Sequence, residues 1–171
     1  MKITLKNIKH AKFASRETYC FTANIYVDGK RRGTVENDGR GGCNNERWDD
    51  GAFGKTVYEY IKTLPELPLP WDETKTMPQS FDLMISLLVT DWLTAKELKT
   101  EMRKGLLILD SKCKEGEYHI FTVPDTYLKH RTTHGREGFF DRLKRKGAID
   151  EDARCLNLMP VEEATEIWAK L

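Results

Sequence analysis

The chain has 171 residues, of which 39% are hydrophobic and 32% charged, and this is enough to bury the core of one compact domain. Its 28 Lys and Arg residues almost balance its 27 Asp and Glu residues, which argues against a general polyanion binder that acts through net charge. No apolar run approaches the roughly 20 residues of a membrane span, and the first residues lack the apolar segment of a secretory signal. We therefore expect a cytoplasmic protein with no membrane partner.

The N-terminal part of the chain predicts antiparallel strands. Residues 2–14 alternate loosely between apolar and polar side chains, and residues 19–27 alternate regularly. Asp28-Gly29 is a strong two-residue turn signal, so residues 32–36 are expected to pair back as the second arm of a hairpin. A glycine-rich segment follows, and we expect it to connect a strand to a helix.

Apolar residues at helical spacing predict a helix over residues 53–64, before a proline-rich stretch at residues 65–79 ends it. Ser80 can cap the next helix, in which Phe81, Ile85 and Trp92 lie on one apolar stripe. Thr94 and Glu97 have the spacing of a capping box, so a second helix to about Lys104 begins there or the first one continues.

Residues 106–109 and 118–123 predict a second hairpin, and short helices are expected at residues 137–146 and after Pro160. The order of these elements predicts an α+β fold, with a mainly antiparallel sheet from the N-terminal meander and the later hairpin packed on a central buried helix. We expect one domain over residues 1–171, with a proline-rich surface excursion at 65–79 and a basic excursion at 125–147.

The glycine-rich segment at residues 37–45, here called the glycine loop, is the strongest candidate for a functional site. Glycine reaches positive φ without a steric clash, and Asn and Asp tolerate it, so successive N–H groups could converge on an anion. A phosphate-bearing ligand is the expectation, although a loop of this kind also forms without a ligand, and Trp48 is either a base-stacking residue or part of the core. The candidate ligand-binding residues are Arg32, Asn37, Asp38, Gly39, Arg40, Gly41, Gly42, Asn44, Arg47 and Trp48.

A second candidate patch lies in the basic excursion. Between residues 129 and 146 the chain carries seven Lys or Arg residues against two acidic ones, interleaved with aromatic side chains. Such a segment is typical of a nucleic-acid surface or a nucleotide pocket, and equally of a solvated excursion. Its candidate residues are Lys129, His130, Arg131, His134 and Arg136.

No catalytic signature is present, so we expect a protein that binds rather than catalyses, without a cofactor and without a metal site. The four cysteines form no Cys-x-x-Cys pair and are expected to be reduced. An alternative is a metal-dependent phosphodiesterase that holds Mg²⁺ with Asp38, Glu46, Asp49 and Asp50, because hard cations prefer clustered oxygen ligands.

The run from Phe21 to Asn44, with a strand, an Asp-Gly turn, a strand and then Asn-Asp-Gly-x-Gly-Gly, resembles small uncharacterised proteins encoded by bacteriophages and other mobile elements. The resemblance covers the first third of the chain and supplies no catalytic residues. It implies a bacteriophage setting in a bacterial host cell. Together with the anion-binding chemistry expected of the glycine loop, this setting suggests a counter-defence role, in which the protein sequesters a nucleotide signal or binds nucleic acid. The alternative is an inhibitor that binds a host protein and has no small ligand. The sequence does not determine the oligomeric state.

Overall fold

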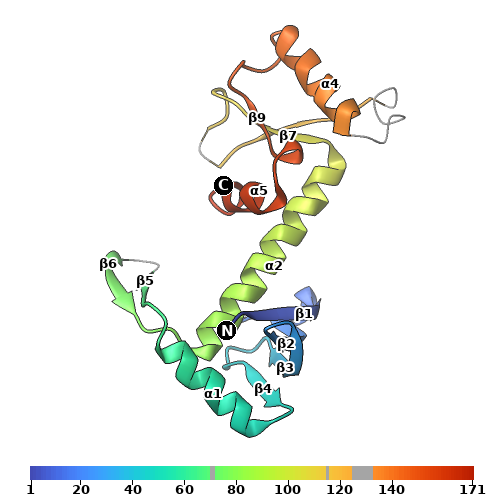
Figure 1. The fold of residues 1–171 in the computed structure, drawn as a ribbon. Helices are drawn as coiled ribbons and strands as arrows, with labels where there is room; N and C mark the ends of the chain where they lie inside the picture. The colour runs from blue at the N-terminus through green and yellow to red at the C-terminus, as the bar shows by residue number, and fades with distance from the viewer. Residues whose placement is uncertain (70–71, 115, 125–132) are drawn as a thin grey trace. The chain divides into compact units, whose positions relative to one another are not determined.

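The computed structural model spans residues 1–171 and describes all of them except 70–71, 115 and 125–132, together with the side chains of residues 73, 133 and 134 (Figure 1). The contacts divide the chain into two compact units, Met1–Asp91 and Trp92–Leu171, here called the N-terminal and the C-terminal unit. The predicted α+β class with antiparallel sheets is confirmed. The single domain stays a prediction, and each unit is described by itself.

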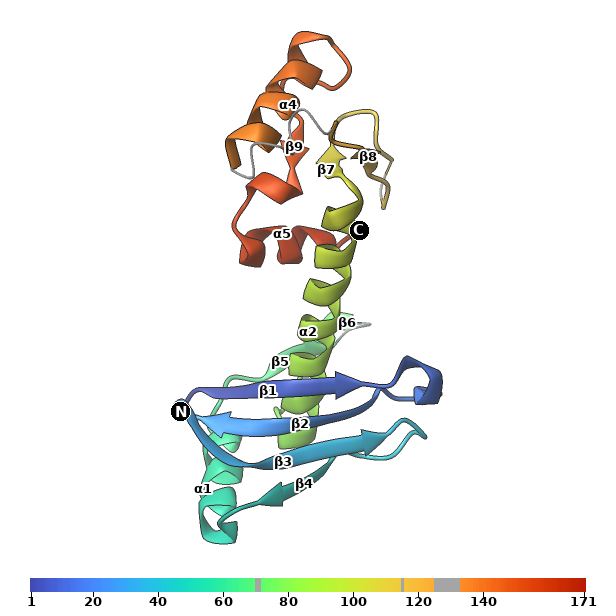
Figure 2. The ribbon, with the colours of Figure 1, turned by 90° about the vertical axis from the view of Figure 1, so that its right-hand side faces the viewer.

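A four-stranded antiparallel sheet forms the frame of the N-terminal unit (Figure 2). Its strands follow each other in chain order as the predicted meander: β1 (Ile3–His10), β2 (Cys20–Val27), β3 (Lys30–Asp38) and β4 (Asn45–Trp48). The predicted turn between β2 and β3 is confirmed, since Asp28 and Gly29 have φ values of 49° and 77°. In β1 the register shifts between Lys6 and Lys9, where Asn7 has a φ of 55°.

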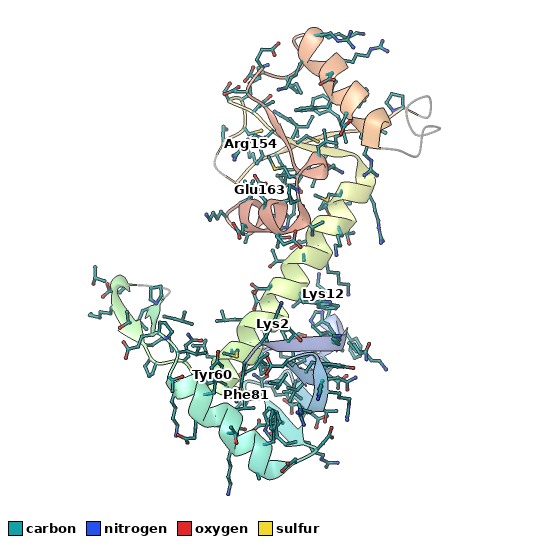
Figure 3. All side chains as sticks on the ribbon, in the orientation of Figure 1. Lys2, Lys12, Tyr60, Phe81, Arg154 and Glu163 are labelled. Carbon is teal, nitrogen blue, oxygen red and sulfur yellow. The ribbon has the colours of Figure 1, made fainter. Side chains whose placement is uncertain are left out.

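One face of this sheet is buried because alternate residues of a strand point to the same side. Phe21, Ala23, Ile25 and Val27 of β2 are all buried. Helix α1 (Gly51–Lys62) and the start of α2 (Phe81–Lys104) cover this face (Figure 2). Phe81, labelled in Figure 3, joins the elements through ring contacts with Trp48 of β4 and Tyr58 of α1.

The proline-rich stretch contains a hairpin that the sequence analysis did not predict. Strands β5 (Leu67–Leu69) and β6 (Asp72–Met77) form a separate two-stranded sheet. Pro68 is compatible with a strand in so small a sheet because an edge strand needs no N–H on its outer side.

Of the two possibilities at Thr94, a new helix or a continuation of the first, the structure has the continuation, since α2 runs without interruption from Phe81 to Lys104. Ser80 caps its start as predicted, with its Oγ accepting a hydrogen bond from Leu83 N at 3.1 Å. At its end, Asn157 Nδ2 donates to the carbonyl oxygens of Met102 and Gly105, both at 3.1 Å.

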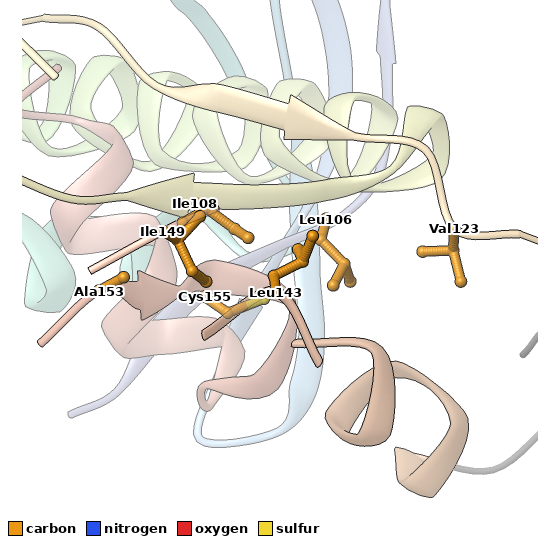
Figure 4. Close-up of a cluster of buried hydrophobic side chains, with 7 residues drawn as sticks. All are labelled: Leu106, Ile108, Val123, Leu143, Ile149, Ala153 and Cys155. Atoms are coloured by element: carbon orange, nitrogen blue, oxygen red, sulfur yellow. The ribbon is translucent and has the colours of Figure 1, made fainter. Parts of the chain in front are cut away.

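In the C-terminal unit, β7 (Leu106–Leu109) is the central strand between β8 (His119–Phe121) and β9 (Arg154–Cys155). The predicted hairpin is confirmed as β7 and β8, but it belongs to a different sheet from the N-terminal meander. Helices α4 (Thr133–Arg145) and α5 (Val161–Trp168) correspond to the two predicted C-terminal helices. Figure 4 shows one core cluster of this unit, formed by Leu106, Ile108, Val123, Leu143, Ile149, Ala153 and Cys155.

Candidate functional site

The glycine loop forms the closed end of the β3–β4 hairpin. The expectation that it leads directly into a helix is wrong, because residues 45–48 pair with residues 33–36 before α1 begins at Gly51. The pair Glu36–Asn45 closes the hairpin, and Gly33–Trp48 stands at its open end. Residues 37–44 therefore lie at one end of the hairpin and Trp48 at the other.

The expected backbone geometry is confirmed at two glycines. Gly39 has a φ of 81° and Gly41 a φ of 93°, which is the left-handed region that glycine enters without a steric penalty. A Cβ at position 39 would also lie only 2.4 Å from the carbonyl oxygen of Ala14. The carbonyl oxygen of Gly39 accepts hydrogen bonds from Arg16 N and Glu17 N at 2.9 and 3.0 Å, so the loop is fastened to the residues that precede β2.

Asn37 organises the loop from a buried position. Its Oδ1 accepts hydrogen bonds from Thr18 Oγ1 and Gly39 N, each at 2.8 Å. Its Nδ2 donates to Gly42 O at 2.9 Å and to Asn44 Oδ1 at 3.2 Å. The side-chain amide of Asn37 thus makes four hydrogen bonds, three within the loop and one to Thr18 in the segment before β2.

Asn44 links the loop to helix α2. Its backbone N–H donates to Asp82 Oδ1 at 2.7 Å, and its Nδ2 donates to Asp82 O and Ser86 Oγ at 3.1 and 3.2 Å. Since Asn37 and Asn44 are also bonded to each other, the loop and the first turns of α2 form one hydrogen-bonded assembly within the N-terminal unit.

Four N–H groups of the loop are engaged by protein acceptors and are therefore not available to an anion. Gly39 N donates to Asn37, Arg40 N to Asp38, Gly41 N to Thr18 and Asn44 N to Asp82. Within the described residues, the N–H groups of Gly42 and Cys43 have no acceptor, and both residues are exposed. The loop thus offers two free amides rather than a nest of converging ones.

A cavity of about 490 Å³ lies beside the loop, and we call it the loop pocket. The segment before β2, the strands β2 and β3, the loop and the start of α2 each contribute to its wall. It is lined by Ser15, Arg16, Glu17, Thr18, Tyr19, Phe21, Asn37, Gly42, Asn44, Asp82, Ser86, Val89 and Thr90.

The loop pocket combines the groups that a polar aromatic ligand requires. Tyr19 supplies an aromatic ring that is 43% exposed, and its ring contacts His10 edge-on at a centroid distance of 5.8 Å. The hydroxyls of Ser86 and Thr90 belong to α2, and the charged residues that line the pocket are Arg16, Glu17 and Asp82. Because two acids and one cation line it, the loop pocket suits a ligand recognised chiefly by hydrogen bonds, with at most one anionic group, held by Arg16.

Three of the predicted ligand-binding residues lie away from the loop pocket. Arg32 places its guanidinium 4.2 Å from the ring centre of Phe53. Trp48 contacts Phe53, Tyr58 and Phe81, so its position in the aromatic core agrees with the second of its two predicted roles. Arg47 is exposed on β4 opposite Thr34.

The other predicted residues are close together in the loop. Asn37, Gly42 and Asn44 line the loop pocket. Asp38, Gly39, Arg40 and Gly41 complete the same turn of chain, and the side chains of Asp38 and Arg40 are exposed.

The acids of the alternative magnesium site each have a separate partner. Asp38 accepts from Arg40 N, Asp49 pairs with Arg31 at 2.7 Å, and Asp50 caps α1. Glu46 accepts a hydrogen bond from the Tyr58 hydroxyl, whose pKa is raised by burial first and by this bond second. In the described part of the chain, these four acids do not form a group that could share one ion.

The second candidate patch falls mostly on parts of the chain that are not described. Lys129, His130 and Arg131 lie outside the described residues, as does the side chain of His134. Arg136 is exposed on α4 in the C-terminal unit.

Sequence reasoning missed Arg16, Thr18, Tyr19 and the contribution of α2 to the loop pocket. One signal was present in the sequence: Asp82, Ser86 and Thr90 recur every four residues and so form a polar stripe on the otherwise apolar stretch at residues 81–90. The segment at residues 15–19 carries no comparable signal.

Comparisons with protein-family models, with curated proteins and with solved structures find no match for this chain. Every helix in the described ranges is too short or too polar to span a lipid bilayer.

Proposed function

We propose that the protein is a small binding protein whose N-terminal unit recognises a phosphate-bearing ligand of nucleotide size in the loop pocket. The volume of about 490 Å³ carries this proposal, because small-molecule sites typically have volumes of roughly 300–1,000 Å³ and a few well-placed polar groups. The proposal keeps the phosphate-bearing ligand predicted from the sequence and changes the residues that bind it.

The phosphate end of the ligand is assigned to Arg16 and the free amide of Gly42. Both line the loop pocket, and the hydrogen bond from Arg16 N to Gly39 O holds the start of the Arg16 side chain beside the loop. A guanidinium and a backbone N–H are common phosphate ligands.

The base and sugar are assigned to the remaining wall. Tyr19 offers a ring for stacking, and Ser86 and Thr90 offer hydroxyls to the polar edge of a base or to a ribose. The bonds of Asn44 to Asp82 and Ser86 hold this wall in place before the ligand arrives, which lowers the entropic cost of binding. In the bacteriophage setting that the resemblance implies, the protein would sequester a nucleotide signal of the host's defence.

A thermal-shift panel tests the proposal. It contains inorganic phosphate, mono-, di- and cyclic nucleotides and short DNA and RNA, because a ligand that binds only the native state raises its melting temperature. We expect a nucleotide to raise the melting temperature of the wild-type protein, and Arg16→Ala to abolish this shift.

Arg47→Ala is the matched control, since Arg47 is exposed on β4 and does not line the loop pocket. The same shift in Arg16→Ala as in the wild type would contradict the assigned site. No shift with any compound would contradict the proposed ligand and favour a host protein as the partner.

A further inference from the structure

A second polar cluster lies in the C-terminal unit, in the hairpin formed by β7 and β8. Asp110 follows the last residue of β7, Cys113 lies in the connection, and His119 is the first residue of β8. A carboxylate oxygen of Asp110, Cys113 Sγ and a ring nitrogen of His119 all lie within 4.8 Å of one another. We call these three residues the Asp110 cluster.

Asp110 carries the unusual feature of this cluster. Its side chain is only 1% exposed, and its Oδ2 is buried with no hydrogen-bond partner among the described residues. Buried carboxylates are normally paired or hydrogen-bonded through both oxygens, because an unpaired one loses its hydration without compensation. A cation bound by the Asp110 carboxylate would compensate for this lost hydration.

The spacing of the three ligand atoms fits one small cation. Asp110 Oδ1 lies 3.5 Å from His119 Nε2 and 3.5 Å from Cys113 Sγ. Two ligands of a tetrahedral zinc ion, each at about 2.0–2.3 Å from the metal, are separated by roughly 3.3–3.8 Å. Both separations from Asp110 Oδ1 fall in this range, and the Cys113–His119 separation, which is within 4.8 Å, would have to close by at most about 1 Å for all three to bind one ion.

The polypeptide already holds these side chains near their positions. Asp110 Oδ1 accepts a hydrogen bond from Lys112 N at 3.0 Å, and Cys113 N donates to Asp110 O at 3.1 Å, so Asp110 and Cys113 occupy the two ends of one turn. Ser111, inside the turn, is anchored to Asp150 by a hydrogen bond from Ser111 N at 3.2 Å. The pairing of His119 with Ile108 fixes the third ligand in the sheet.

We propose that Asp110, Cys113 and His119 bind one zinc ion. A thiolate, an imidazole and a carboxylate are the ligand types that zinc prefers, and the soft sulfur disfavours Mg²⁺ and Ca²⁺. The Cys113 thiol gives its proton to solvent as the metal–sulfur bond forms, and the ion neutralises the buried carboxylate. His119, which is 45% exposed, lies at the solvent side, so water is the fourth ligand.

Cobalt(II) is the probe for this site because a thiolate bound to it produces a charge-transfer absorption band in the near ultraviolet. The full-length protein is reduced, stripped of metal with a chelator and titrated with cobalt(II) and then with zinc(II). We expect one equivalent of cobalt to produce the thiolate band and the visible bands of four-coordinate cobalt, and zinc to displace it. The absence of a thiolate band in the wild-type protein would overturn the proposal.

Cys113→Ser is expected to remove the charge-transfer band, and Cys43→Ser is the matched control because Cys43 is an exposed cysteine of the N-terminal unit. His119→Gln is expected to weaken cobalt binding at least tenfold and leaves the turn at residues 110–113 unchanged. A band that persists in Cys113→Ser and disappears in Cys43→Ser would place the metal at a different thiol and would also overturn the proposal. Both readouts are independent of any nucleotide, so they do not depend on the loop pocket.

Discussion

Two buried polar side chains, Asn37 in the N-terminal unit and Asp110 in the C-terminal unit, are in opposite hydrogen-bonding states. In the N-terminal unit, Asn37 is 6% exposed, and both its oxygen and its nitrogen make two hydrogen bonds. In the C-terminal unit, the side chain of Asp110 is 1% exposed, and one of its oxygens has no partner among the described residues. The complete hydrogen bonds of Asn37 stabilise the fold by themselves, whereas the unpaired oxygen of Asp110 belongs to the site where we propose that zinc binds.

The largest expected effect comes from Asn37→Ala. This change removes four hydrogen bonds and leaves buried donors and acceptors unpaired, so we expect the free energy of unfolding of the N-terminal unit to fall by about 3–5 kcal/mol. Urea denaturation monitored by tryptophan fluorescence would measure it. Asn45→Ala is the control, since Asn45 is exposed, and a loss of less than about 1 kcal/mol in Asn37→Ala would show that the hydrogen bonds do not stabilise the loop.

Gly39→Ala is expected to destabilise the same unit by about 3 kcal/mol. An alanine at position 39 would have to adopt a φ of 81°, which is unfavourable for a residue with a side chain. Its Cβ would also lie 2.4 Å from Ala14 O. Gly42→Ala in the same loop meets no atom within 4 Å and should change the stability by less than about 0.5 kcal/mol. Equal unfolding midpoints for the two variants would contradict this account of the loop.

Asp110→Asn tests the buried side chain whose hydrogen bonds are incomplete. In chelator, we expect the variant to be at least as stable as the wild type, because the change removes a buried charge that lacks full compensation. With free zinc at 100 times its dissociation constant, the wild type should gain about 2.7 kcal/mol and the variant should gain much less. If the wild type and the variant differed in stability by the same amount in chelator and in zinc, the proposed zinc site would be contradicted.

The smallest effect concerns the anchor of the turn that carries Asp110. The pKa of Asp150 is lowered, first by the hydrogen bond from the Ser111 hydroxyl and then by the charge of Lys112. A lowered pKa means that the bond contributes stability above the ordinary pKa of about 3.8 and that this contribution is lost as the pH falls through the lowered value. In Ser111→Ala, NMR titration should show the pKa of Asp150 rising towards its ordinary value.

Asp72 provides the control for that titration, because its pKa is lowered by a different hydroxyl, that of Thr74. We expect Ser111→Ala to leave the pKa of Asp72 unchanged. A rise at both carboxyls would indicate a general change in the protein rather than the loss of one bond.

Local signals predicted most of the fold. The Asp28-Gly29 turn, the Ser80 cap and the β7–β8 hairpin depend on neighbouring residues and are all confirmed. Strand β4 and the β5–β6 hairpin were missed, since β4 has only four residues and prolines suggested a loop around β5. The separation of the sheets was also missed, because strand pairing between distant segments leaves no local pattern.

The candidate site was predicted only in part. The loop and its positive φ values follow from glycine itself, so Asn37, Gly42 and Asn44 were found. Two of the four acceptors that engage the loop amides come from Thr18 and Asp82, which are 23 and 38 residues away from their partners in the sequence. Such contacts depend on how the chain returns to itself, and spacing in the sequence does not contain that information.

The four-stranded sheet of the N-terminal unit ends on one side with β1 and on the other with β4. Unpaired backbone groups on an edge strand can recruit the same strand of another molecule, and this is a common route to fibrils. The irregularity at Asn7 bends β1, and Lys6 and Lys9 place like charges along it, while β4 is only four residues long. Neither edge is a long, straight and uncharged template, so we expect this unit to resist aggregation through strand addition.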